Sequence, residues 1–160
     1  MARKDKQRVS LTTPATAEPP VFPVAQPGLG AAVLSALARS FWAKSGDSGS
    51  WLSVVQHLMD AADVAGLLFD EYLSEHHRRL MASVWGGDRA KARASFVFLA
   101  GVHDAGKVDI RFACQRQDLA ELIRRQGLVV LRKRDYPERS FLPHGLVSQF
   151  ALQEEIAAGG

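Results

Sequence analysis

The sequence of 160 residues contains one cysteine, Cys114, which excludes an internal disulfide and any cysteine-rich zinc site. No apolar run approaches the roughly 18 residues that a membrane-spanning helix needs, and the first residues lack the apolar segment of a secretory signal. A large net charge is also missing, because the formal value is only +3 at pH 7. Such a charge tolerates an anionic partner without requiring one. We therefore expect a soluble cytoplasmic protein without a membrane partner.

Proline is scarce after residue 28, because five of the seven prolines lie before it. Residues 1–28 combine these prolines with Thr, Ala, Val and four basic side chains. This mixture cannot bury much surface. We expect a flexible, disordered leader over residues 1–28 and one folded domain over residues 29–160.

Helical periodicity dominates the remaining sequence, and the predicted fold class is all-α. Asp88 and Asp118 are expected to cap helices, and Gly127 is expected to end one. The small and polar residues 43–50 favour turns, and residues 128–131 suit a brief extended segment before a loop. His76 and His77 stand beside two arginines and are expected at a solvated helix end. The helices are predicted over residues 28–42, 51–73, 89–103, 118–126 and 143–156.

The stretch Phe96–Lys107 ends a hydrophobic helix with two polar residues, His103 and Asp104, and stops at Gly106. Phe96, Leu99, Ala100 and His103 recur at helical spacing, which predicts that His103 lies on the buried stripe of its helix. Taken alone, the pair is explained more simply by a core histidine beside a solvated aspartate than by metal ligands. His57 alone is likewise explained as an ordinary histidine at the border of an apolar stripe.

Considered together, His57, His103, Asp104 and His144 predict a metal site, because they lie on helices that are able to meet. Neutral imidazole with carboxylate suits Mn, Fe, Co, Ni or Zn better than Mg or Ca. Such an ion lowers the pKa of bound water and polarises a phosphoryl oxygen, the chemistry of phosphoester hydrolysis. Lys107, one turn beyond the pair, is placed to neutralise a phosphate. From residue 105 to residue 140, nine basic residues exceed five acidic ones.

These motifs resemble the histidine-aspartate (HD) phosphohydrolase superfamily, an all-helical group with a lone histidine and a later His-Asp pair. More narrowly, the sequence is similar to the HD-type nuclease domain of the CRISPR-associated helicase-nuclease of type I systems. Family members typically have isoleucine where Ala105 stands, and Phe112 fits a phenylalanine that packs beneath the site. The similarity covers residues 35–156, and its four motifs occur in the family's order. The matching segments are residues 41–45, 51–65, 98–107 and 142–148.

The resemblance implies a metal-dependent nuclease that degrades single-stranded DNA in antiviral defence. His57 would be the first metal ligand, His103 and Asp104 the central pair, and His144 a later ligand. Asp104 and Lys107 would take part in catalysis, with Lys107 near the scissile phosphate. The implied cofactor is Mn, Ni, Co or Fe, with two ions in a complete domain. The basic residues 107–139 would steer the strand by its phosphates.

One departure concerns the residues that follow in the family, a His-His pair and an aspartate that complete the metal shell, and then a helicase. This sequence stops at Gly160, so we expect a truncated, amino-terminal part of the domain with little or no activity. The implied partners are single-stranded DNA, the CRISPR surveillance complex and a helicase region encoded separately or lost. Apolar residues are expected to be exposed on the helices that bear His57 and His144.

Two alternatives stay open at this stage. The first is a nucleotide phosphohydrolase of the same superfamily, which needs a late acidic ligand for which Glu154 and Glu155 are the candidates. The second is a non-catalytic helical module that binds nucleic acid or a partner protein, supported by the basic loop and the incomplete shell. Metal-dependent cleavage of single-stranded DNA would separate the nuclease from both.

Overall fold

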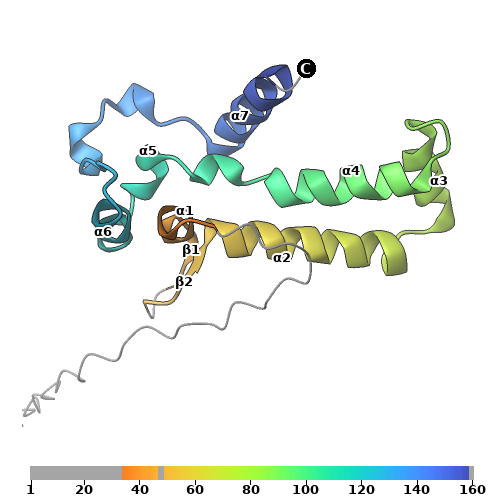
Figure 1. The fold of residues 1–160 in the computed structure, drawn as a ribbon, viewed down its shortest axis with the longest axis horizontal. Coiled ribbons are helices and arrows are strands. Elements are labelled where there is room, and N and C mark those ends of the chain that lie inside the picture. The colour runs from red at the N-terminus through yellow and green to blue at the C-terminus, as the bar shows by residue number, and fades with distance from the viewer. Residues whose placement is uncertain (1–33, 47–48, 159–160) are drawn as a thin grey trace, which may run out of the picture.

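The structure, a computed structural model, describes residues 34–46 and 49–158, so the predicted leader over residues 1–28 lies outside the described residues. Helices dominate, which confirms the all-α class, and one two-stranded hairpin is added to them (Figure 1). No helix in the described ranges is long and apolar enough to cross a membrane. The elements are α1 (Ala36–Ser40), β1 (Trp42–Ser45), β2 (Trp51–Ser53), α2 (Val54–Leu67), a π-helical turn η1 (Leu68–Tyr72), α3 (Glu75–Ser83), α4 (Arg89–Val102), the 3-10 turn η2 (Ala105–Lys107), α5 (Ile110–Ala113), α6 (Gln117–Arg125), the 3-10 turns η3 (Lys133–Asp135) and η4 (Glu138–Ser140), and α7 (His144–Ala158).

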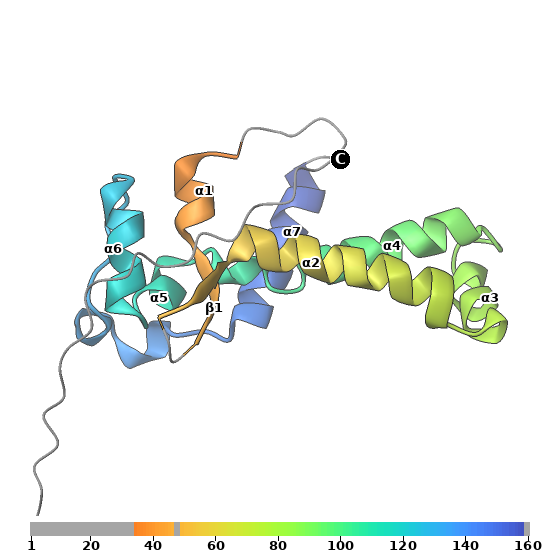
Figure 2. The same ribbon diagram turned by 90° about the horizontal axis from the view of Figure 1, so that it is seen from below.

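Helices α2 and α4 lie side by side and antiparallel, with α3 across their far ends (Figures 1 and 2). They approach closely because glycine stands at the contact on each helix. A Cβ atom on Gly101 would lie 3.4 Å from Cβ of Ala62, and one on Gly66 would lie 3.0 Å from the Arg93 guanidinium. This register brings the first turn of α2 to the last turn of α4.

The predicted helix boundaries around residues 42–53 are wrong, because this segment forms the hairpin β1–β2 instead. Residues 28–33 of the first predicted helix lie outside the described residues, and the described part ends at Ser40. The predicted turn joins two strands, closed by a 2.9 Å hydrogen bond from the Gly46 N–H to the Ser50 carbonyl. Helix α2 therefore begins at Val54, where the Ser53 side chain accepts the N–H of Gln56.

The other predicted helices are close to those observed. Asp88 caps α4 as expected, and Gly127, at φ 89°, follows α6. Asp118 is not a cap, because α6 begins one residue earlier and has no side-chain cap. Residues 128–131 form no strand, and α7 extends through Ala158, two residues beyond the predicted end. The main core joins the hairpin to α2, α5 and α6, through Phe41, Ala43, Val54, Ala113, Cys114, Ala120, Ile123 and Val130.

The predicted buried stripe on α4 is wrong at two of its four positions, whereas Phe96 packs against a core cluster and Ala100 is half-buried. Leu99 is 62% exposed, and the His103 side chain is 46% exposed. The face of α4 that meets α2 carries Arg93, Val97 and Gly101 instead, at steps of four residues. Large apolar residues are exposed on both helices for which this was expected, including Val64 and Leu67 on α2 and Phe150 and Ile156 on α7.

Candidate metal centre

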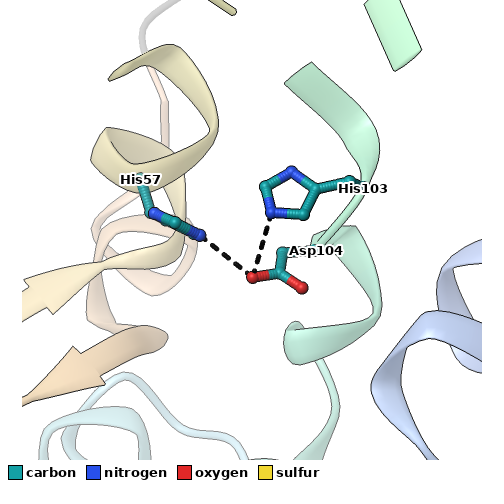
Figure 3. A group of neighbouring side chains, drawn as sticks. All are labelled: His57, His103 and Asp104. Carbon is teal, nitrogen blue, oxygen red and sulfur yellow. Dashed lines mark hydrogen bonds and ion pairs between the residues drawn. The ribbon is translucent and has the colours of Figure 1, made fainter. Parts of the chain in front are cut away.

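Asp104 lies at the centre of the site, directly after α4, and is only 6% exposed. One carboxylate oxygen, Oδ2, lies 2.9 Å from Nε2 of His57 and 3.3 Å from Nε2 of His103 (Figure 3). The other oxygen, Oδ1, lies 3.1 Å from Nε2 of His144. The structure thus brings the four predicted metal-site residues together around a single carboxylate.

Each of these side chains is delivered by the end of a different element. His57 occupies the first turn of α2, and the antiparallel register places it opposite the end of α4. His103 is the C-cap residue of α4, and Asp104 is the N-cap residue of the 3-10 turn η2 that follows. His144 is the first residue of α7, which packs against η2. Three segments far apart in the sequence therefore converge on one point.

The donor set fits a transition metal. The ligand atoms of His57, His103 and Asp104 all lie within 4.8 Å of one another. Nδ1 of His103 lies 2.7 Å from the carbonyl oxygen of Ala100 and must donate its hydrogen to it, because a carbonyl only accepts. When the His103 ring carries no second hydrogen, the lone pair of Nε2 faces a carboxylate oxygen, and a metal ion bound between the two atoms removes their repulsion. Backbone hydrogen bonds of this kind orient histidine ligands in metal proteins.

Lys107 is buried beside Asp104, with 5% of its surface exposed. Its ammonium nitrogen lies 2.6 Å from Oδ2 of Asp104 and donates a 3.2 Å hydrogen bond to the carbonyl oxygen of Ala43. The same nitrogen lies 5.6 Å from the centre of the Phe112 ring. The sequence suggested a phosphate contact for this lysine, whereas its charge is directed inward, onto the carboxylate.

The surroundings of Asp104 favour its ionised form. Burial raises the pKa of the carboxyl group, but hydrogen bonds from the Lys107 ammonium and His57 outweigh burial and lower this pKa to about 2. The carboxylate is therefore charged at neutral pH. A charged carboxylate is the form that ligates a metal ion.

Two residues that support the site were not found as such in the sequence. The buried Ser148 hydroxyl accepts the N–H of Gly106 at 2.8 Å and lies 3.0 Å from the carbonyl oxygens of His103 and His144. Gly106 was expected only to stop a helix. A Cβ atom there would overlap the His144 carbonyl oxygen and lie 2.8 Å from Cβ of Val147, so only glycine lets α7 approach. Ser148 is the last residue of the matching segment 142–148, but nothing in the sequence indicates that its hydroxyl joins α7 to η2.

Aromatic rings form the base of the site. The centre of the Phe112 ring lies 4.5 Å from that of Trp42 and 5.7 Å from that of His144. The Trp42 side chain is fixed by a 3.3 Å hydrogen bond from Nε1 to the Ala113 carbonyl. Phe112 thus lies beneath the site, as the resemblance implied. His76 and His77, in contrast, are exposed on α3, as expected for a solvated helix end.

The sequence of this chain is similar to those of known proteins. The family model described as "Cas3, HD domain" matches residues 42–160. A curated relative, the CRISPR-associated nuclease/helicase Cas3 of Streptococcus thermophilus, is 29% identical over 137 residues. The match covers 73% of this chain but 15% of the relative, so the chain spans only a small part of that protein's length. No solved structure matches the chain significantly.

Proposed function

This chain belongs to the Cas3 HD-domain family, and on that premise we propose that it is a metal-dependent nuclease domain that hydrolyses the phosphodiester bonds of single-stranded DNA in a CRISPR system. The observation that carries the proposal is the convergence of His57, His103 and His144 on the carboxylate of Asp104. The packing of α-helices does not by itself require three imidazole rings around one buried carboxylate. They supply the donor atoms of a metal centre.

The proposed ligands are His57, His103 and Asp104, with His144 on the opposite carboxylate oxygen. Mn, Ni, Co and Fe are the divalent ions that best suit imidazole together with carboxylate. When bound, such an ion lowers the pKa of a coordinated water and polarises a phosphoryl oxygen, which is the chemistry that phosphodiester hydrolysis needs.

Lys107 is a positioning residue in this proposal. Its buried ammonium bridges Asp104 and the hairpin through the Ala43 carbonyl, which fixes the carboxylate against the end of α2. The Phe112 ring packs beside both Lys107 and His144. Other cations must therefore make the phosphate contact that was expected for Lys107.

The proposed partners follow from the relative's name. The Streptococcus thermophilus protein is described as a nuclease and helicase, and a helicase supplies single strands. We propose that this domain acts on strands delivered by a helicase region and works with a CRISPR surveillance complex.

The test is cleavage of labelled single-stranded DNA with Mn²⁺, Ni²⁺ or Co²⁺, compared with cleavage in EDTA. We expect metal-dependent cleavage that is abolished in the double variant His103→Ala, Asp104→Ala. The matched control His76→Ala, Glu71→Ala removes the same two chemical groups from exposed positions and should retain cleavage.

Three results would contradict the proposal. Equal cleavage by the wild type and by the His103, Asp104 double variant would remove the site from consideration. Metal-dependent release of phosphate from deoxynucleotides, without strand cleavage, would identify a nucleotide phosphohydrolase instead. DNA binding without a metal-dependent change in melting temperature or cleavage would identify a non-catalytic module.

A further inference from the structure

Two groups can be distinguished among the basic residues between 105 and 140. Four are neutralised within the fold, because each forms a close ion pair with a carboxylate at 3.2 Å or less. These cations support the structure and contribute little to the charge presented to a ligand. They are Lys107, Arg111, Arg116 and Arg124.

A second group consists of three consecutive, exposed residues at the start of η3, namely Arg132, Lys133 and Arg134. Lys133 makes no ion pair among the residues that the structure describes. Arg134 is 74% exposed, and its Nε lies 3.8 Å from the Asp135 carboxylate, at the limit of an ion pair. This group therefore presents positive charge to solvent, because none of its ion pairs is as close as those of the first group.

Lys133 and Arg134 line an open groove of about 750 Å³ together with Tyr136 and Glu138. Two further residues in its wall, Gln115 and Phe141, also line a narrower cleft that contains Phe112 and His144. The groove that carries the exposed cations and the cleft at His144 therefore adjoin each other at Gln115 and Phe141.

We propose that this groove binds the phosphates of a single-stranded polynucleotide whose backbone runs from Lys133 and Arg134 past Gln115 to the metal centre. The inference rests on the proposed nuclease function and identifies where its substrate lies. Phosphates complement the two cations, and one acid, Glu138, opposes them in the groove wall. Tyr136 and Phe141 add aromatic rings to the wall of the same groove. Cations interleaved with aromatic rings are typical of surfaces that bind single strands, whose bases are free to stack.

The test measures binding of a fluorescent oligothymidylate of 20 nucleotides in EDTA, so that binding is independent of cleavage. The variant Lys133→Ala, Arg134→Ala is compared with the control Arg79→Ala, Lys91→Ala, which removes the same charge from exposed positions on α3 and α4. For two lost phosphate contacts, the slope of log affinity against log salt should fall by about 1.4, and affinity at 0.1 M salt by about tenfold. The control should retain the wild-type slope and affinity, and melting curves verify that both variants fold.

The possible results separate this inference from the proposed function. Equal losses of DNA affinity in both variants, or no loss in either, would refute the proposed binding groove even if the wild type cleaves DNA. Stronger binding of a duplex than of the single strand, or no wild-type binding, would also overturn it. A loss confined to the Lys133, Arg134 variant supports the groove, and it does so even when the wild type shows no metal-dependent cleavage. In that case, the proposed nuclease fails and the binding site stands.

Discussion

Replacing Lys107 with methionine tests whether this lysine holds Asp104 in place or contacts the substrate. Methionine keeps most of the apolar stem beside Phe112 but removes the ammonium group, which lies 2.6 Å from Oδ2 of Asp104. The Asp104 carboxylate then keeps His57 and His144 as partners but loses the permanent positive charge of the Lys107 ammonium group beside it. If Lys107 has a positioning role, the cost should appear in the stability of the protein without any substrate.

The expected loss is large because both partners are buried. Removing one member of a buried ion pair typically destabilises a protein by about 3 to 5 kcal/mol. Asp104 retains two imidazole contacts, so we place the loss for Lys107→Met at about 3 kcal/mol, the lower end of that range. For a protein of this size, 1 kcal/mol shifts the melting temperature by about 3 °C, which gives a decrease of about 9 °C.

The assay is thermal unfolding in EDTA and again with saturating Mn²⁺. We expect the gap between wild type and Lys107→Met to narrow with Mn²⁺, because a bound cation replaces part of the missing charge. An ion at 100 times its dissociation constant stabilises the folded state by about 2.7 kcal/mol. The control Lys91→Met removes an exposed lysine from α4 and should change little in either condition.

An unchanged melting temperature in EDTA would refute the positioning role of Lys107. A variant that is as stable as the wild type but has a raised KM for DNA would instead support a direct phosphate contact. A gap that Mn²⁺ leaves unchanged would show that the metal does not share the Asp104 carboxylate with Lys107.

Three further predictions concern the supports of the site. Gly106→Ala should displace α7, lowering both the melting temperature and the affinity for Mn²⁺ measured by calorimetry, and unchanged values would refute the close packing. Ser148→Ala should lower the free energy of unfolding in urea by about 1 to 3 kcal/mol, because it leaves the buried N–H of Gly106 without a partner. Burial raises the pKa of Asp109, but hydrogen bonds from Arg111 outweigh burial and hold this pKa below its usual value. The stabilisation from Asp109 should therefore be present above about pH 4 and be lost as the pH falls through the lowered pKa. Urea unfolding should show that Asp109→Asn is less stable than wild type at pH 7. This difference in stability should shrink at about pH 3.

The order of the helices and the three histidines around Asp104 could be predicted because they depend on local signals. A histidine in a long periodic helix and a His-Asp pair at a helix end are visible without knowledge of the packing. The burial of Lys107 could not be predicted in this way, because lysine is almost never buried unless it is paired. Its partners, Asp104 and the Ala43 carbonyl, are brought to it only by tertiary folding.

The wrong face predicted for α4 has a specific cause. Counting apolar residues selected the stripe that contains Leu99, whereas the observed contact with α2 passes through Gly101 and Val97. Close helix packing favours small residues such as glycine at the contact. A pattern of hydrophobic residues does not mark these positions, because glycine is scarcely hydrophobic. The hairpin was missed for a related reason. The three-residue strand Trp51–Ser53 is too short for its alternation to stand out against the helical pattern that follows it.

The two carboxylate oxygens of Asp104 depend on separate parts of the fold. The partners of Oδ2 are held by the α2–α4 contact and by Lys107, whereas His144, beside Oδ1, depends on the docking of α7 through Gly106 and Ser148. A weakened α7 should therefore remove His144 while His57 and His103 stay in place. If so, Gly106→Ala and His144→Ala should lower Mn²⁺ affinity by similar factors, and combining them should add little. If the two losses of Mn²⁺ affinity add in the double variant, Gly106 must also support the residues beside Oδ2, and the two sides of the carboxylate are not independent.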